Sequence, residues 1–191
     1  MTPRYTRIPE GQNIPYNLPP APKGFTWKVM PELLMDVLIP DGWYYTQRLT
    51  DDVDEFYVTK EFFDIETGKY STGMSVKIYR ETENVDESAN EYIFNLTFGE
   101  TTKKVVDSMQ VNSKSNTITL YSLLLESEIP DLEPGDPNRK KKMVCNAIAD
   151  IRNKTLYLMV FESPLALWDE EWNARGGPVT LSVINLLFAG R

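Results

Sequence analysis

Six consecutive residues without a polar face, Leu-Tyr-Leu-Met-Val-Phe at 156–161, strongly constrain the fold of this chain. A strand places alternate side chains on opposite faces of its sheet, so a strand that is apolar on both faces must be covered on both sides. We therefore expect this segment to lie at the centre of a sheet, with other parts of the chain packed on each face.

Other segments alternate apolar with polar residues, which is typical of half-buried antiparallel strands. In one of them Met74, Val76 and Ile78 alternate with polar or amphipathic neighbours. Arg152-Asn153-Lys154 separates two apolar runs and predicts a hairpin. Strands are predicted over 26–30, 34–39, 54–61, 72–80, 117–126, 143–151 and 155–161.

The helical signals do not alternate with the strands. Ser88 and Glu91 have the spacing of a capping box, which predicts a helix over 89–109. A second helix is predicted to begin at Pro164 and to end at Gly176-Gly177, and a third to begin at Pro178. This order favours an α+β fold, in which a mainly antiparallel sheet of about six or seven strands carries helices on its faces.

The first 24 residues contain six prolines and few side chains to bury. Proline removes backbone hydrogen-bond donors and favours extended chain. We therefore predict a proline-rich arm over 1–24 and a single domain over 25–191. The arm either lies as a strap on its own domain or binds a partner.

The chain of 191 residues contains no histidine and one cysteine. Histidine performs most general acid–base catalysis near neutral pH and ligates most transition metals. Ser-His-Asp and Cys-His sites and histidine-bound zinc or haem are therefore excluded, and we expect no cofactor and no stoichiometric zinc, copper or iron. Cys145 lies in an alternating apolar segment, which indicates a buried thiol rather than a reactive one.

The formal net charge of −8 repels nucleic acid and anionic lipid alike. No segment approaches the roughly 20 apolar residues that span a bilayer. The first residues also lack the apolar run of a secretory signal. We expect no binding of nucleic acid, no membrane insertion and a cytoplasmic location.

Two aromatic groups are candidate partner-binding residues. Trp43-Tyr44-Tyr45 follows a Pro-Asp-Gly turn, and because strand residues alternate, these three side chains cannot share one face. We expect Trp43 in the core and Tyr44 at the surface, with Tyr45 as a further candidate. Trp168 and Trp172 are four residues apart on a predicted helix. They either clamp the helix to the sheet or form an exposed binding stripe, and the clamp is favoured.

An acidic loop offers a weak candidate for calcium, with Asp131, Glu133 and Asp136 as oxygen ligands. Its spacing is not that of an EF-hand. Solvated loop charge is the favoured interpretation, with the basic run at 139–142 neutralising it.

Three segments resemble one known superfamily. They are Ile39-Pro40-Asp41-Gly42-Trp43, Thr72-Gly73-Met74-Ser75-Val76 and Tyr157-Leu158-Met159-Val160-Phe161-Glu162-Ser163-Pro164. In order and spacing, over most of 25–191, they are similar to the PsbP-like or Mog-type superfamily. It includes the photosystem II extrinsic protein PsbP, the Ran-binding Mog proteins and bacterial DcrB-like proteins. The resemblance implies an α-β-α sandwich and proteins that bind other proteins or assist assembly, without enzymatic activity.

Three functions remain open at this stage. The leading hypothesis is a non-enzymatic protein-binding module: an adaptor, an assembly factor or a chaperone. The second is a hydrolase that uses carboxylates only, with or without a divalent cation. The third, a subunit associated with a photosynthetic complex, depends wholly on the resemblance.

Overall fold

The computed structural model of the chain describes residues 18–30, 33, 35–63, 65, 70–98, 103–128 and 132–188. The greater part of the arm predicted over 1–24 lies outside these residues, so the arm remains a prediction.

Strands dominate the described residues and form two antiparallel sheets. The strands are β1 (Phe25–Met30), β2 (Met35–Pro40), β3 (Tyr44–Leu49), β4 (Asp54–Thr59), β5 (Gly73–Tyr79), β6 (Lys103–Asn112), β7 (Ile118–Glu128), β8 (Lys140–Asp150) and β9 (Thr155–Pro164). β1 and β2 pair with each other, and the other seven form one sheet in the order β3-β4-β5-β9-β8-β7-β6. The apolar run at 156–161 lies in β9, between β5 and β8, so its predicted central position is confirmed.

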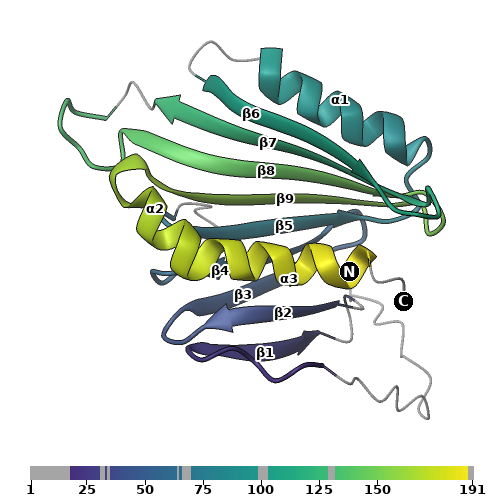
Figure 1. The fold of residues 1–191 in the computed structure, drawn as a ribbon, viewed down its shortest axis with the longest axis horizontal. Helices are drawn as coiled ribbons and strands as arrows, with labels where there is room; N and C mark the ends of the chain where they lie inside the picture. The colour runs from purple at the N-terminus through teal and green to yellow at the C-terminus, as the bar shows by residue number, and fades with distance from the viewer. Residues whose placement is uncertain are drawn as a thin grey trace.

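Helices cover both faces of the seven-stranded sheet (Figure 1). The helix α1 (Val85–Phe98) packs on one face, where Val85 and Ala89 meet Ala147 of β8 and Leu156 of β9. On the other face lies a helical segment made of η2 (Leu165–Leu167), α2 (Trp168–Glu171), η3 (Trp172–Gly176) and α3 (Gly177–Phe188).

The main core lies between that second face and its cover. Val179 and Val183 of α3 and Met30 and Val37 of the β1–β2 pair meet apolar residues of the sheet. The sheet contributes Phe56, Val58, Met74, Val76, Ile78, Ile118, Leu120, Ile148, Met159 and Phe161. The predicted α+β class, an α-β-α sandwich around a mainly antiparallel sheet, is therefore confirmed.

Two predicted helices are wrong in extent. The helix predicted over 89–109 ends at Phe98, and β6 occupies 103–112 instead. The boundary predicted at Gly176-Gly177 does not exist, because η3 continues directly into α3. Gly176 serves close packing there, since a Cβ atom at this position would lie 2.4 Å from the ring of Phe161.

Candidate functional site

An exposed pair of aromatic rings stands at one end of β3. Tyr44 is 47% exposed and Phe62, just after β4, is 76% exposed. Their ring centroids are 5.9 Å apart in an edge-to-face arrangement, with an interplanar angle of 86°. Large exposed apolar side chains that touch each other are candidates for binding another molecule.

The pair lies on the face of the sheet that α1 covers, but away from α1, which lies against β6, β7, β8 and β9. Three other rings cover part of the sheet there. Tyr57 of β4 lies 4.4 Å from Phe63 and 6.3 Å from Tyr70 between ring centroids, and Phe63 lies 5.4 Å from Tyr70. Burial raises the pKa of Tyr70, so its phenol stays protonated. This cluster, in which Tyr57 and Phe63 are buried and Tyr70 is partly buried, anchors the chain next to Phe62.

A buried carboxylate lies on the same face, further along β4. Glu55 is 2% exposed and accepts charged hydrogen bonds from Arg48, 2.5 Å away, and forms an ion pair with Lys77 at 3.3 Å. Desolvation opposes ionisation of Glu55, but the two cations outweigh it and lower its pKa. The strand that carries Tyr44 is therefore joined to β4 and β5 by a buried ionic group.

The three consecutive aromatics separate as strand alternation predicted. Trp43 and Tyr45 are partly buried and pack against the main core, whereas Tyr44 faces solvent. The ring of Tyr45 lies 6.3 Å from that of Phe56, its hydroxyl donates to the side chain of Gln47, and the Lys28 ammonium stands 5.2 Å above the ring. Tyr45 therefore supports β3 from the core side and is only partly exposed.

Trp168 and Trp172 clamp the helical segment to the sheet. Their rings stack at 5.3 Å with an interplanar angle of 8°, and both contact Phe161, at 5.9 and 5.5 Å between centroids. Trp168 is buried and Trp172 partly buried. The two indoles do not form an exposed stripe, because they pack against Phe161 and against each other.

The acidic loop is structured by its own contacts. Asp136 accepts a hydrogen bond from the amide of Asn138 at 2.7 Å, and Arg139 pairs with Glu128 at 2.9 Å. Asp131 lies outside the described residues, and Glu133 is exposed. Over the part of the chain that the structure describes, no three potential ligands stand close enough to hold a metal ion.

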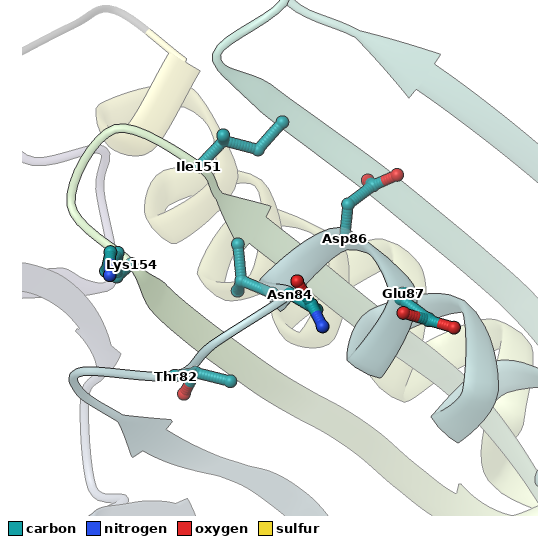
Figure 2. Close-up of a pocket in the computed structure, with 7 residues that line it drawn as sticks. Thr82, Asn84, Asp86, Glu87, Ile151 and Lys154 are labelled. Carbon is teal, nitrogen blue, oxygen red and sulfur yellow. The ribbon is translucent and has the colours of Figure 1, made fainter.

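A pocket of about 420 Å³ lies where α1 begins, beside the turn between β8 and β9 (Figure 2). It contains two carboxylates, Asp86 and Glu87, which point in different directions in Figure 2. Asp86 accepts a hydrogen bond from the hydroxyl of Tyr121 at 3.2 Å. Lys154, at the rim, pairs with Glu83 at 2.7 Å. The two carboxylates thus do not converge on one point, as a pair acting as acid and base would.

Cys145 is buried in β8, with 1% of its surface exposed. Burial raises the pKa of its thiol to about 12, so the thiolate that reacts with electrophiles is scarce at neutral pH. The predicted burial of this thiol is confirmed.

Phe62 was not among the candidate residues predicted from the sequence. The signal that could have found it was the doublet Phe62-Phe63 in a polar stretch after a predicted strand. The alternation argument applied to Trp43-Tyr44-Tyr45 holds for this doublet too, and the structure separates it in the same way: Phe63 is 2% exposed and Phe62 is 76% exposed.

Comparison with solved structures shows a PsbP-like fold. The solution structure of cyanobacterial PsbP (CyanoP) from Synechocystis superposes with a TM-score of 0.55, covering 86% of this chain and 94% of that protein at 12% identity. The crystal structure of a protein of unknown function from Pseudomonas aeruginosa gives a TM-score of 0.43, covering 80% of this chain and 92% of that one at 13% identity. No protein-family model matches the sequence, and neither does any curated protein sequence.

The helices of the described residues are also too short or too polar to cross a membrane.

Proposed function

We propose that this protein is a non-enzymatic module that binds another protein, and that the Tyr44–Phe62 pair anchors the partner. The observation that supports this most directly is the geometry of the pair, two large rings in mutual contact and open to solvent, whose neighbours Tyr45 and Phe63 pack into the fold. Protein interfaces draw much of their binding energy from a few such aromatic anchors.

The base of the pair reduces the entropic cost of binding. Tyr44 begins a paired strand, and Tyr45, its neighbour, is held from the core side. Phe62 is followed by the buried Phe63. Side chains already fixed by their neighbours lose less conformational freedom when a partner docks on them.

The partner's surface must complement the two aromatic rings and the positive charges that lie on the same face. Arg48 and Lys77 lie on the same face as Tyr44 and remain 43% and 45% exposed while they pair with Glu55. An apolar patch with acidic residues at its rim would fit this face, and the binding should weaken with salt.

Affinity purification from the native cell tests the proposal. The double variant Tyr44→Ala/Phe62→Ala should lose the partner, with affinity reduced by about 30-fold or more, because truncating a good anchor costs roughly 2 kcal/mol. Its melting temperature should change little, since both side chains are exposed.

The matched control is Phe94→Ala/Phe98→Ala. These two rings are also exposed, 57% and 71%, and in contact at 4.6 Å, but they lie on α1. This variant should keep the partner. Retention of the partner by the Tyr44/Phe62 variant, or equal loss in both variants, would contradict the proposed surface.

Single substitutions separate folding from binding. Trp43→Ala should lower the free energy of unfolding, because Trp43 packs against the main core, whereas Tyr44→Ala should leave stability intact and reduce binding. Urea denaturation measures the first effect and a binding titration the second.

A photosynthetic complex is the second candidate partner. The likeness to cyanobacterial PsbP favours it, although one fold serves many functions. Recovery of photosystem subunits with the wild-type chain, and not with the Tyr44/Phe62 variant, would select this candidate. The cytoplasmic location is part of the main proposal, and cell fractionation tests it.

A further inference from the structure

The strand β6 forms one edge of the seven-stranded sheet and is exposed along almost its whole length. Its apolar side chains are open to solvent: Val105 is 36% exposed, Val106 43%, Met109 55% and Val111 41%. No other strand within the described residues pairs with its outer side. A long exposed edge with apolar side chains is a template for pairing with another strand.

The backbone groups that are open for pairing can be identified. The amide of Ser113 donates to the carbonyl of Ile118 at 2.8 Å, which continues the ladder between β6 and β7. Residues bonded to a neighbouring strand alternate along an antiparallel ladder. Val111 and Met109 therefore bond to β7, and the backbone groups of 108, 110 and 112 point outward.

A side-chain contact agrees with this assignment. The amide of Ser108 donates to the carboxylate of its own neighbour Asp107 at 2.8 Å, as an amide that points away from β7 can. An irregularity between Val105 and Asp107 interrupts the ladder, which leaves 107–113 as the straight part of the edge. Within it, 108–112 reads Ser-Met-Gln-Val-Asn and carries no charge.

This segment is self-complementary. If two copies pair antiparallel about Gln110, Met109 of each lies opposite Val111 of the other, and Ser108 lies opposite Asn112. Apolar residues then face apolar residues on one side of the sheet, and polar residues face polar ones on the other. A register centred on Met109 would instead place Asp107 opposite Val111.

Charge also favours this register. It places Asp107 opposite Ser113 of the second copy, next to Lys114, which is exposed. In the dimer, the Asp107 carboxylate would exchange its hydrogen bond with the Ser108 amide for the nearby ammonium of Lys114 in the second copy. Because no like charges lie opposite each other in this register, the edge lacks the repulsion that usually keeps edge strands apart.

We propose that β6 is a homodimer interface, in which a second copy of this chain pairs antiparallel through residues 108–112 about a two-fold axis at Gln110. The dimer joins the two sheets into one, while α1, which packs on β7, β8 and β9 and also contacts β6, stays on one face of the joined sheet. Pairing through five residues buries less surface than a standard interface of roughly 1,600 Å². The dimer is therefore weak, and its population depends on protein concentration. This proposal does not depend on the Tyr44–Phe62 pair, which lies near β3, the strand at the opposite edge of the sheet.

Sedimentation across a wide range of protein concentration tests the proposal. The wild-type chain should show a reversible equilibrium between monomer and dimer. Gln110→Pro should abolish it, because proline removes an outward amide and edge strands tolerate proline where the amide faces solvent. Circular dichroism and the melting temperature should show that the monomer still folds.

A second variant keeps the test valid if Gln110→Pro does not fold. Val111→Lys replaces an exposed apolar residue by a charge that faces Met109 of the second copy, twice in each dimer. The dissociation constant should rise roughly tenfold. As a matched control, Leu181→Lys places the same charge at a residue of α3 that is 52% exposed, and should leave the equilibrium unchanged.

Amide hydrogen exchange locates the contact. Protection of the amides of 108, 110 and 112 should increase with protein concentration in the wild type but not in Val111→Lys. The proposal is wrong if the chain stays monomeric at every concentration, in which case a strand from a different protein becomes the candidate for this edge. It is equally wrong if a dimer forms that neither variant weakens.

Discussion

Replacing Gly176 with alanine should destabilise the fold, although alanine is the better helix former. A Cβ atom at 176 would lie 2.4, 2.5 and 2.6 Å from three ring carbons of Phe161. Phe161 has no exposed surface, and the stacked indoles of Trp168 and Trp172 stand beside its ring. The ring therefore has no free space into which it can turn.

The expected magnitude follows from two opposing effects. An extra methyl group in a packed core costs about 1–3 kcal/mol, and the enclosed ring places this site near the upper value. The exchange of glycine for alanine within a helix returns about 1 kcal/mol. We expect a net loss of about 2 kcal/mol in the free energy of unfolding, or about 4–8 °C in melting temperature for a chain of this size.

Urea denaturation of Gly176→Ala and of Gly177→Ala tests this reasoning. The nearest atom to a Cβ at 177 is the carbonyl oxygen of Trp172 at 3.1 Å, and the next lies at 3.7 Å, so this control should change stability by less than about 1 kcal/mol. Adding Phe161→Leu should make the Gly176→Ala cost smaller than it is in the wild type, because the two sites share one contact. A Gly176→Ala variant as stable as the wild type would refute the argument.

Three further predictions concern buried groups and metals. Glu55→Gln should cost about 1–2 kcal/mol at neutral pH, since Arg48 and Lys77 lose a charged partner but stay half exposed. Because the folded-state pKa of Glu55 is lowered from 4.5, the stability that its charge contributes is present above that value and is lost as the pH falls below it. Urea titrations from pH 7 to pH 3 should therefore show the free energies of unfolding of the two proteins converging. A difference that stays constant over this range would contradict the prediction. Cys145 should react with a thiol reagent only after unfolding, as the buried thiol has a pKa of about 12, and rapid labelling of the native protein would count against it. Elemental analysis of purified protein should find no zinc, copper or iron in stoichiometric amount, and one such ion per chain would overturn the expectation drawn from the missing histidines.

Strands that are buried in the fold could be predicted from the sequence, whereas an exposed strand could not. β9 was predicted to be central because both of its faces are buried, and that condition leaves an unambiguous apolar run. β6 was predicted as part of a helix because almost all of it is exposed, so no alternation distinguished it from its surroundings. Val106 and Met109 are three residues apart, which also fits a helix, and only pairing with β7 reveals the strand.

The same reason explains the candidate site. Alternation predicted that Tyr44 would face away from Trp43 and Tyr45, and the expectation that Tyr44 is the exposed one agrees with the structure. For Phe62-Phe63, alternation predicts that the two rings face opposite ways but not which of them is exposed, because the doublet lies after the end of β4. The contact of Phe62 with Tyr44 joins two segments that meet only in the folded chain. The continuity of η3 and α3 could not be predicted either, since two glycines usually end a helix and only the ring of Phe161 explains Gly176.

The order of the seven strands has a consequence for how the chain is synthesised. β3, β4 and β5 are neighbours in sequence and so are β6 to β9, but the two groups meet only where β5 pairs with β9. One edge of β5 therefore stays unpaired until residues 155–164 have left the ribosome. The β1–β2 pair covers only part of the apolar face of β4 and β5, and the rest stays uncovered until α3, near the end of the chain, arrives. Contacts so distant in sequence make folding slow, and they leave the first half of a nascent chain exposed to aggregation until translation is nearly complete.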